Sequence, residues 1–515
     1  MAVSKLNPSA GGIPFGNTAG RPTPATGKLY SNGETARIEL YTQAGAWENI
    51  VQEVPGVASI TGIYSESTNS GTIVIQGTNF VSGAIASAIG TNGVEVLASS
   101  TTFNSLVQLT ATFTGLSNAY EPYDIKVTNP SNLFGLLPDI LYVNANPIWQ
   151  TASGSLGTFN EQVSISVSAT ATDDSTITYS LASGSTLPTG VTLNSSTGLI
   201  SGTLPDIVSN TTYTFTINAS DGLNPSVSRS FSIQSIALLA EILVIGGGGS
   251  GSTGNGGSGG GGAGGLVYSS SYALLSGTKS ITIGAGGASA STGATGSNGA
   301  NTILGDITAF GGGAGKGWTA GQGNSGGSGG GGGSGSGYGA GGGATTQTSP
   351  SGAIGYGNIG GTGNPGGGPY SGGGGGGAGG AGGNATASTS VANGGVGLAY
   401  SITGTSIYYA GGGGSGTEEG GYTSSGLGGN GGGGRGGYLN TPGVSGTANT
   451  GGGGGGGGYP QASYASGAGG SGVVIIAYPN TFSALTISGG LTYDQPTRSG
   501  YRVYRFTAGS GTVTF

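Results

Sequence analysis

Apolar and polar residues alternate with a period of two between residue 55 and about residue 145. One run sets four apolar residues against three polar ones: Val107, Leu109, Ala111 and Phe113 against Gln108, Thr110 and Thr112. A second run sets Ile125 and Val127 against Asp124, Lys126 and Thr128. This pattern is typical of a β-sandwich in which each sheet has one buried and one solvated face. It predicts a first sandwich over residues 55–146.

The same alternation returns between residues 147 and 238. The apolar members of its two clearest runs are Ile165, Val167 and Ala169, then Tyr213, Phe215, Ile217 and Ala219, and the residues between them are polar. This segment is predicted to form a second sandwich. Each sandwich can bury an ordinary apolar core, at about 25 cal/mol per Å² of apolar area.

Residues 1–54 contain more turn signals than strands. Two strand candidates, residues 27–30 and Arg37 to Tyr41, flank the turn Ser31-Asn32-Gly33-Glu34. Asn-Gly between apolar runs is a strong hairpin signal. The segment is predicted to be a small β-hairpin module, with Trp47 in its core.

The glycine content rises sharply after Ile245. Residues 246–480 hold 95 of the 123 glycines, interrupted by strand candidates at residues 280–283 and 473–478. Glycine runs can form polyproline-II-type helices, which have three residues per turn. Without side chains such helices can pack closely and form backbone hydrogen bonds to one another. Residues 239–480 are therefore predicted to form a bundle of polyglycine-II helices with flanking β-strands, which excludes large and charged residues.

The last segment, residues 481–515, returns to strands. Residues 501–507 and 511–515 are separated by Ala508-Gly509-Ser510. The pattern predicts a terminal β-hairpin that caps the glycine-rich segment or pairs with a neighbouring chain.

Composition argues against catalysis and against nucleic acid. The chain has no histidine and no cysteine, which removes the commonest general base, the thiolate nucleophile and the thiolate metal ligands. Its net charge of −7 is unfavourable for binding nucleic acid. The stretch from Gly246 to Gly251 satisfies a GxGxxG pattern, but more glycine follows it, and no acid occurs before Asp306. We therefore reject a dinucleotide site and expect no cofactor.

Acidic residues in the second sandwich offer a weak alternative. Glu161, Asp173, Asp174 and Asp221 match places where cadherin-like domains can hold calcium between modules. Calcium requires six to eight oxygen ligands, and four scattered carboxylates supply few of them. Solvated loop acids are the competing interpretation, and we expect no metal.

The first residues of the chain and its apolar runs indicate the compartment in which the protein is made and acts. The first twenty residues have no apolar signal core, and the longest apolar stretch, Ile236 to Ile245, is interrupted by Glu241. No membrane insertion is expected. A protein that is made in a host cytoplasm without signal or disulfide, and acts outside a cell, fits a virion component released by lysis.

Several motifs resemble modules of bacteriophage fibres. GKLYSNGETARIELYTQAGAWENI (27–50) resembles a virion-attachment module of phage tail fibres, and VPGVASITGIYSESTNSGTIVIQGTNF (54–80) resembles the IPT/TIG domain. Residues 187–203, from LPTGVTL to LISGT, resemble the cadherin-like "putative Ig" domain, with Val191 in place of the usual leucine. AEILVIGGGGSG (240–251) and GGSGVVIIAY (469–478) resemble the ends of the glycine-rich domain of phage tail adhesins. The resemblance implies an all-β chain with two immunoglobulin-like sandwiches followed by packed polyglycine-II helices.

The same resemblance implies a function. A fibre or adhesin of a tailed phage would attach to tail or baseplate proteins through residues 1–54. It would bind a host glycan or outer-membrane protein through loops of the glycine-rich domain, in a homotrimer. The combination of modules resembles phages of aquatic bacteria, cyanobacteria among them. A purely structural fibre, tail or head-decoration protein is the alternative. A glycan-degrading enzyme is a third, for which Glu418 and Glu419 are the only near pair of acids in the glycine-rich segment.

Large side chains excluded from a helix bundle must collect at its ends and faces. Aromatic rings with a polar group suit binding surfaces because they offer a large contact area with few rotatable bonds. The predicted receptor-binding residues are Trp318, Tyr338, Tyr356, Tyr370, Glu418, Glu419, Tyr422, Arg435, Tyr438, Tyr459 and Tyr464.

Overall fold

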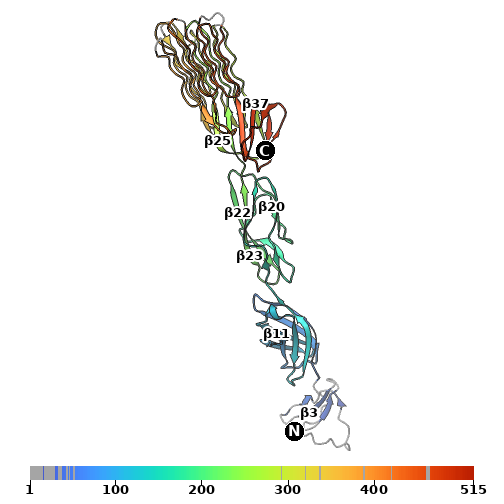
Figure 1. Cartoon of the computed structure of the whole chain (residues 1–515). Coiled ribbons are helices and arrows are strands. Elements are labelled where there is room, and N and C mark those ends of the chain that lie inside the picture. Colours follow the sequence, from blue (N-terminus) through green and yellow to red (C-terminus); the bar gives the residue numbers. More distant parts are fainter. Residues whose placement is uncertain are drawn as a thin grey trace, which may run out of the picture.

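The computed structural model describes residues 53–515 apart from 292, 319–320, 336–337, 387–388, 419 and 460–463, and within residues 1–52 only residue 45 and four short strands. This described part is almost wholly β, with a single 3-10 turn, η2 (Asn118–Tyr120), and no α-helix. None of its helices is long and apolar enough to cross a membrane. The modules follow one another along a long axis, with β3 near one end and the glycine-rich domain at the other (Figure 1).

The N-terminal strands confirm the predicted hairpin. They form one sheet in chain order: β1 (Phe15–Gly16), β2 (Leu29–Asn32), β3 (Arg37–Tyr41) and β4 (Trp47–Asn49). β2 and β3 are antiparallel, with Leu29 opposite Leu40. Ser31 and Asn32 belong to β2 rather than to the predicted turn. The remaining turn residues and the Trp47 side chain lie outside the described residues.

The first sandwich has two sheets. One has the order β10-β11-β7-β6-β14, with β5 also paired to β7, and comprises β5 (Gly56–Thr61), β6 (Tyr64–Ser65), β7 (Ser70–Thr78), β10 (Ser100–Ser105), β11 (Gln108–Thr114) and β14 (Val143–Asn144). The other has the order β13-β12-β8-β9 and comprises β8 (Ile85–Ile89), β9 (Glu95–Leu97), β12 (Tyr123–Thr128) and β13 (Phe134–Leu141). The predicted inward residues Leu109, Ala111 and Phe113 are fully buried, as are Ile125 and Val127. Val107 is the exception: it precedes β11 and is 52% exposed.

The second sandwich is built in the same way. Its sheets have the orders β16-β23-β22-β19, β17-β21-β20 and β15-β18, formed by β15 (Ile148–Trp149), β16 (Gly154–Asn160), β17 (Ser164–Ser168), β18 (Ala171–Thr172), β19 (Thr178–Leu181), β20 (Val191–Leu193), β21 (Leu199–Thr203), β22 (Thr211–Ser220) and β23 (Val227–Ile236). Trp149 packs edge-on against Phe231, with ring centroids 5.4 Å apart. The core combines these rings with Phe215, Ile217 and Ile233.

Polar side chains connect neighbouring modules. At the joint between the sandwiches, Asn224 donates to the carbonyls of Asn144 and Ala145 at 3.0 and 2.8 Å and accepts from the Ser65 hydroxyl. At the joint with the glycine-rich domain, the Glu161 carboxylate accepts the backbone N–H groups of Ile207 and Leu238. Hydrogen bonds at both joints restrict how the modules can turn relative to one another.

A ten-stranded sheet forms the base of the glycine-rich domain. Its order is β28-β27-β26-β37-β34-β24-β25-β31, with β35 and β36 also paired to β37, and its strands are β24 (Leu239–Ile245), β25 (Leu266–Ala273), β26 (Thr278–Thr282), β27 (Thr302–Leu304), β28 (Ile307–Ala309), β31 (Ile354–Tyr356), β34 (Val473–Pro479), β35 (Thr486–Ile487), β36 (Leu491–Asp494) and β37 (Tyr501–Thr514). Four short strands pair separately: β29 (Ser334–Gly335) with β30 (Tyr338–Gly339), and β32 (Leu398–Tyr400) with β33 (Ile407–Tyr409).

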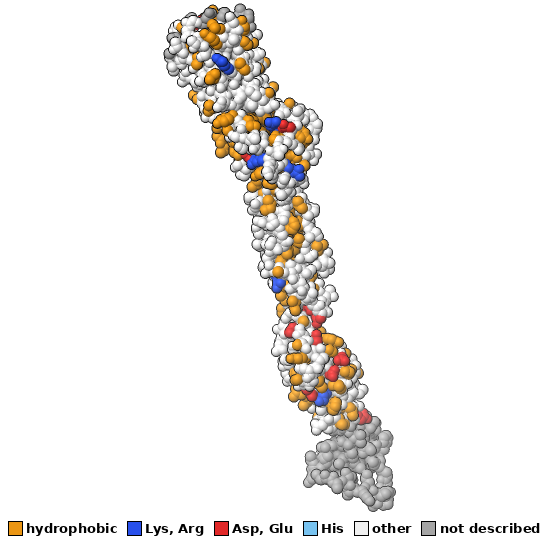
Figure 2. Space-filling model, in the orientation of Figure 1, with side chains coloured by type: hydrophobic (Ala, Val, Ile, Leu, Met, Phe, Trp, Pro, Cys, Tyr) orange, Lys and Arg blue, Asp and Glu red, His pale blue; other side chains and the backbone are white. Residues whose placement is uncertain are grey.

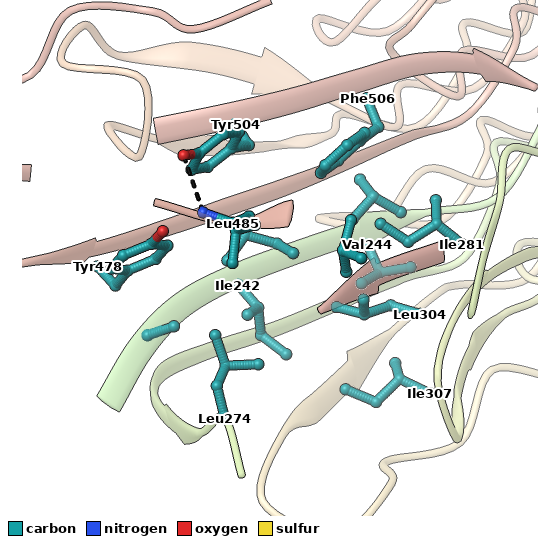
Figure 3. Packing of buried hydrophobic residues seen from close by; sticks show 14 of the residues in the cluster. Ile242, Val244, Leu274, Ile281, Leu304, Ile307, Tyr478, Leu485, Tyr504 and Phe506 are labelled. Carbon is teal, nitrogen blue, oxygen red and sulfur yellow. Dashed lines mark hydrogen bonds between the residues drawn. The ribbon is translucent and has the colours of Figure 1, made fainter. Parts of the chain in front are cut away.

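Both faces of this sheet are covered, which explains its continuous apolar runs. Ile242 and Val244 pack in one cluster, shown in Figure 3, with Tyr478, Tyr504 and Phe506. Leu243 and Ile245, on the opposite face of β24, belong to a second cluster with Ile475 and Tyr409. The sheet thus joins two apolar cores at the base of the domain.

The predicted C-terminal hairpin is wrong. Residues 501–514 form the single strand β37, which lies between β26 and β34 inside the sheet. The predicted turn residue Gly509 has a φ of +92° but continues the strand, and Ser510 pairs with Thr282 on β26. The two halves of β37 have different partners, β34 and β26, so the strand bends without reversing.

Beyond the sheet, the chain forms packed polyglycine-II helices. The segment after β24 shows their three-residue period in its backbone donors. Gly246, Gly249 and Ser252 donate to one neighbouring segment, at Gly265, Gly262 and Gly259. Gly247, Ser250 and Thr253 donate to a second, at Ala300, Ser297 and Ala294, and Gly248 and Gly251 to a third, at Gly470 and Gly467. Three residues per turn therefore direct successive N–H groups to three different neighbours.

Candidate functional site

Large side chains are excluded from the interior of the helix bundle, where the fully buried residues that are not glycine are small ones such as Ser250, Ala263 and Ser328. A Cβ atom on Gly249 would lie 2.2 Å from the Gly313 carbonyl oxygen, and one on Gly261 would lie 2.1 Å from that of Gly249. Real Cβ atoms essentially never approach another atom within 3.0 Å, so backbone would have to move. Large side chains are consequently confined to the outer faces of the bundle and to the loops at its ends.

The loops far from the ten-stranded sheet form what we call the distal surface. The chain leaves β24 at Gly246, turns back at residues 254–257 and returns to the sheet at Leu266. Isolated β-bridges next to this turn identify the neighbouring loops. They pair Gly257 with Ser334, Ser258 with Gly416, and Ser371 with Thr417. The Thr253 hydroxyl donates to the Ser291 carbonyl at 2.7 Å. These loops lie at the end of the molecule opposite to β3 (Figure 1).

Trp318 and Tyr338 contribute two of the distal rings. The Trp318 ring lies directly against backbone, because a Cβ on Gly335 would be 1.8 Å from its Cδ1 atom and one on Gly256 would be 2.8 Å from it. Glycine at both positions therefore makes room for the indole. Tyr338 is 45% exposed. Both residues lie on the distal surface, as the binding prediction requires.

A network of hydrogen bonds orders the loop that carries Tyr370. Glu418 accepts the Tyr370 N–H at 3.0 Å through Oε2, and its own N–H donates to the Tyr370 carbonyl at 2.9 Å. Partial burial raises the pKa of Glu418 above its ordinary value, an effect that the Tyr370 hydrogen bond opposes. The Tyr422 hydroxyl donates to the Pro369 carbonyl at 3.3 Å. The loop is thus fixed from two sides.

Tyr422 and Tyr438 are linked through the same loops. The Tyr438 hydroxyl donates to the Tyr422 carbonyl at 2.7 Å, and the Tyr438 N–H donates to the Thr441 hydroxyl at 2.9 Å. Tyr422 is only 4% exposed, so its ring supports the loops and has almost no surface for a partner. The half-buried Tyr438 ring keeps surface that a partner can contact.

The remaining distal candidates lie next to these loops. Tyr464 is half-buried, and its carbonyl lies 3.3 Å from the Cβ position of Gly457. Tyr459 is also half-buried and follows Gly458, whose Cβ position is 2.7 Å from the Leu439 carbonyl. Glu419 lies outside the described residues.

Tyr356 is not on the distal surface. It belongs to β31, pairs with Leu266 and packs against the basal apolar core. Arg435 is exposed, and its Nε donates to the Ser425 hydroxyl at 3.2 Å. The structure brings together Trp318, Tyr338, Tyr370, Glu418, Tyr422, Tyr438, Tyr459 and Tyr464, and separates Tyr356 from them.

Sequence reasoning missed residues that order the distal loops. Asn364 is 2% exposed, donates to the Pro369 carbonyl at 3.3 Å and accepts the Gly366 N–H at 2.9 Å. Thr441 accepts from Tyr438, as described above. The Asn-Pro pair at 364–365 is a recognised turn signal and could have identified this loop.

The four calcium candidates do not form one site. Glu161 lies at the joint with the glycine-rich domain, whereas Asp221 accepts from Asn144 at the joint with the first sandwich. Both carboxylates already accept backbone N–H groups. Asp173 and Asp174 are adjacent, and burial, then the neighbouring Asp174, raises the pKa of Asp173 to about 6. No group of three or more acids that could hold a metal ion occurs in the described part of the chain.

Comparisons with known proteins fit this arrangement. Residues 225–479 match the family model described as a glycine-rich domain, and residues 144–235 match that described as a "putative Ig domain". No curated protein matches the chain.

Several solved structures share 10–18% identity with parts of the chain. They include DIP-gamma IG1+IG2 (12% identity, 36% of this chain and 99% of that one, TM-score 0.24), protocadherin gamma B2 domains 3–6 (18%, 39% and 55%, 0.20) and titin I67–I69 (10%, 45% and 80%, 0.25). The two family models show that the chain contains an immunoglobulin-like domain followed by a glycine-rich domain.

Proposed function

We propose that the protein is a fibre or adhesin of a tailed-phage virion whose distal surface binds a receptor on the host cell. One observation carries the proposal: the bundle interior has no room for large side chains, and eight of the predicted contact residues collect at its far end. Loops on a rigid scaffold are common binding sites, and half-buried rings lose little conformational freedom on binding. The N-terminal module at the opposite end would attach to tail or baseplate proteins.

The described acids of the glycine-rich domain support a binding role over hydrolysis. Glycosidases place two carboxyl groups about 5 to 9.5 Å apart across the bond that they cleave. Glu418 lies on the distal surface. Asp306 lies in the turn between β27 and β28 at the base, where it accepts from Tyr272, and Glu241 lies on β24 in the basal sheet, paired with Arg498. Purified protein is expected to release no reducing sugar from host polysaccharide. Measurable turnover would reject the proposal in its non-enzymatic form.

The receptor-binding role can be tested with a triple variant, Tyr438→Ala, Tyr459→Ala and Tyr464→Ala. Fluorescently labelled protein is mixed with a panel of aquatic bacteria, cyanobacteria included, and bound fluorescence is measured. On the strains that bind the unaltered protein, we expect the variant to lose at least about tenfold in affinity, since aromatic contacts dominate such surfaces.

The control is Tyr408→Ala, which removes a 50% exposed tyrosine at the base of the same domain. It should bind as the unaltered protein does. If the triple variant melts normally and still adsorbs normally, the distal surface is not the binding site. A purely structural fibre or decoration protein would then be the better interpretation.

A further inference from the structure

The first sandwich has an apolar surface on the outer face of its β13-β12-β8-β9 sheet. Four large apolar side chains are exposed there: Ile85 (52%), Leu97 (63%), Phe134 (53%) and Leu136 (44%). The solvated face of an antiparallel sheet normally carries polar residues. Hydrophobic side chains are indeed prominent on the surface of this sandwich (Figure 2). Large apolar side chains gathered on one exposed face are a feature of interaction sites.

Strand register divides these residues into two strips. Thr128 on β12 pairs with Phe134 on one side and with Ile85 on the other. Lys126 likewise pairs with Leu136 on one side and Ser87 on the other, and Ser87 pairs with Leu97. Phe134 and Leu136 thus form one apolar strip, Ile85 and Leu97 form the other, and polar residues lie between them.

The charges between the strips neutralise each other. The Lys126 ammonium lies 3.0 Å from Glu95 Oε2 and 4.9 Å from the centre of the Phe134 ring. The other Glu95 oxygen accepts the Ser87 hydroxyl. This hydrogen bond, with the Lys126 contact, lowers the pKa of Glu95, so the carboxylate remains ionised and paired. The face consequently presents no unpaired charge that would select a charged partner.

We propose that this face packs against a second copy of this chain lying parallel to the first. A half-turn about an axis along the strands exchanges the two strips. It places the Phe134–Leu136 strip of one copy opposite the Ile85–Leu97 strip of the other, and the paired charges opposite paired charges. An isologous interface requires this self-complementary pattern.

The proposed contact has a consequence for the whole molecule. The strands of the sandwich run roughly lengthwise (Figure 1), so the copies lie side by side with their glycine-rich domains at the same end. The half-turn uses both strips of each copy in a single contact, so the proposed assembly is a dimer and differs from the homotrimer that the resemblance implies. This inference goes beyond receptor binding, because the distal surface of a single chain could bind a receptor without any contact between copies.

Solution mass gives the first test. Light scattering during gel filtration of the full chain should report twice its 48.8 kDa, and Leu97→Asp should return the mass to that of one chain. The matched control is Val208→Asp, which alters a 67% exposed residue of the second sandwich and should keep the larger mass. A monomeric unaltered protein, or a Leu97→Asp assembly of unchanged mass, would overturn the proposal.

Cross-linking tests the geometry even if Leu97→Asp fails to fold. The chain has no cysteine, so introduced cysteines report only their own contacts. Because Leu97 and Leu136 share one row of the sheet, the half-turn places them opposite each other. A mixture of Leu97→Cys and Leu136→Cys chains should form a disulfide between the two variants. Exclusive linking of Leu97→Cys to itself, or no linking, would rule out the parallel arrangement.

Discussion

The sandwiches and the polyglycine-II bundle are stabilised in opposite ways. The first sandwich buries large side chains such as Phe80, Phe113 and Ile125 between two sheets. The bundle interior contains mainly backbone, and its N–H groups bond to neighbouring helices, as Gly249 does to Gly262 at 2.8 Å. A sandwich core can tolerate a similar side chain of slightly different shape. At bundle positions such as Gly249 and Gly261, the smallest possible side chain is already too large.

The largest expected effect comes from adding one methyl group to the bundle. Gly261→Ala would place a Cβ 2.1 Å from the Gly249 carbonyl oxygen. We expect a loss of more than about 3 kcal/mol in the free energy of unfolding, because backbone on both sides must move. Gly367→Ala is the matched control, since nothing lies within 4 Å of its Cβ position and its φ is not in the left-handed region. Thermal unfolding of both variants measures the difference, and equal losses would contradict the side-chain exclusion.

Removing one methyl group from a sandwich core should lower the free energy of unfolding by a smaller amount. Ile125 is fully buried between the sheets of the first sandwich, and Ile125→Val leaves a small cavity. Such substitutions destabilise by about 1 kcal/mol. Chemical denaturation followed by circular dichroism should resolve the shift in the sandwich transition. A loss as large as that of Gly261→Ala would show that both regions are equally intolerant, against the comparison made above.

The smallest effect concerns the second sandwich and depends on pH. The pKa of Asp173 is raised to about 6, and its Oδ2 is buried without a hydrogen-bond partner among the described residues. Because the pKa of Asp173 is higher in the folded chain than in the unfolded chain, its protonation stabilises the folded state. This contribution to the free energy of unfolding is complete below pH 4 and is lost as the pH rises through 6. Asp173→Asn should remove this dependence and stabilise at pH 7 by less than about 1 kcal/mol after solvent screening. Melting temperatures at pH 4 and pH 7 would show it, and a variant with an unchanged pH slope would assign the effect to another group.

How far the sequence predicted the structure also differed between the regions. Alternating residues such as Ile125 and Val127 identified the sandwich strands, because a buried sheet face imposes a period of two. The bundle gave no comparable pattern, because every side of a polyglycine-II helix carries the same residue. The sequence therefore predicted that the segment forms packed polyglycine-II helices, but not which helices are neighbours.

The two wrong predictions, a loop position for Tyr356 and a C-terminal hairpin, have the same cause: partners distant in sequence leave no local pattern. Tyr356 looked like a loop residue because glycine surrounds it, yet it occupies a strand at the base. The C-terminal hairpin was wrong because Gly509 lies where β37 bends between two partners, and partners distant in sequence cannot be read from a local turn signal. Seven of the aromatic candidates do lie in the distal loops. Their contacts, such as that of Tyr438 with Tyr422, depend on helix order and could not be predicted.

The near-absence of side chains inside the bundle also has a calorimetric consequence. The heat capacity of unfolding increases with the apolar area that becomes exposed and decreases with the polar area. Opening the bundle exposes mostly peptide groups, so its heat capacity increment per residue should be much smaller than that of the sandwiches. Its stability curve would be correspondingly flat, and the distal end of the molecule would stay folded on cooling over a wider range than the modules that carry it.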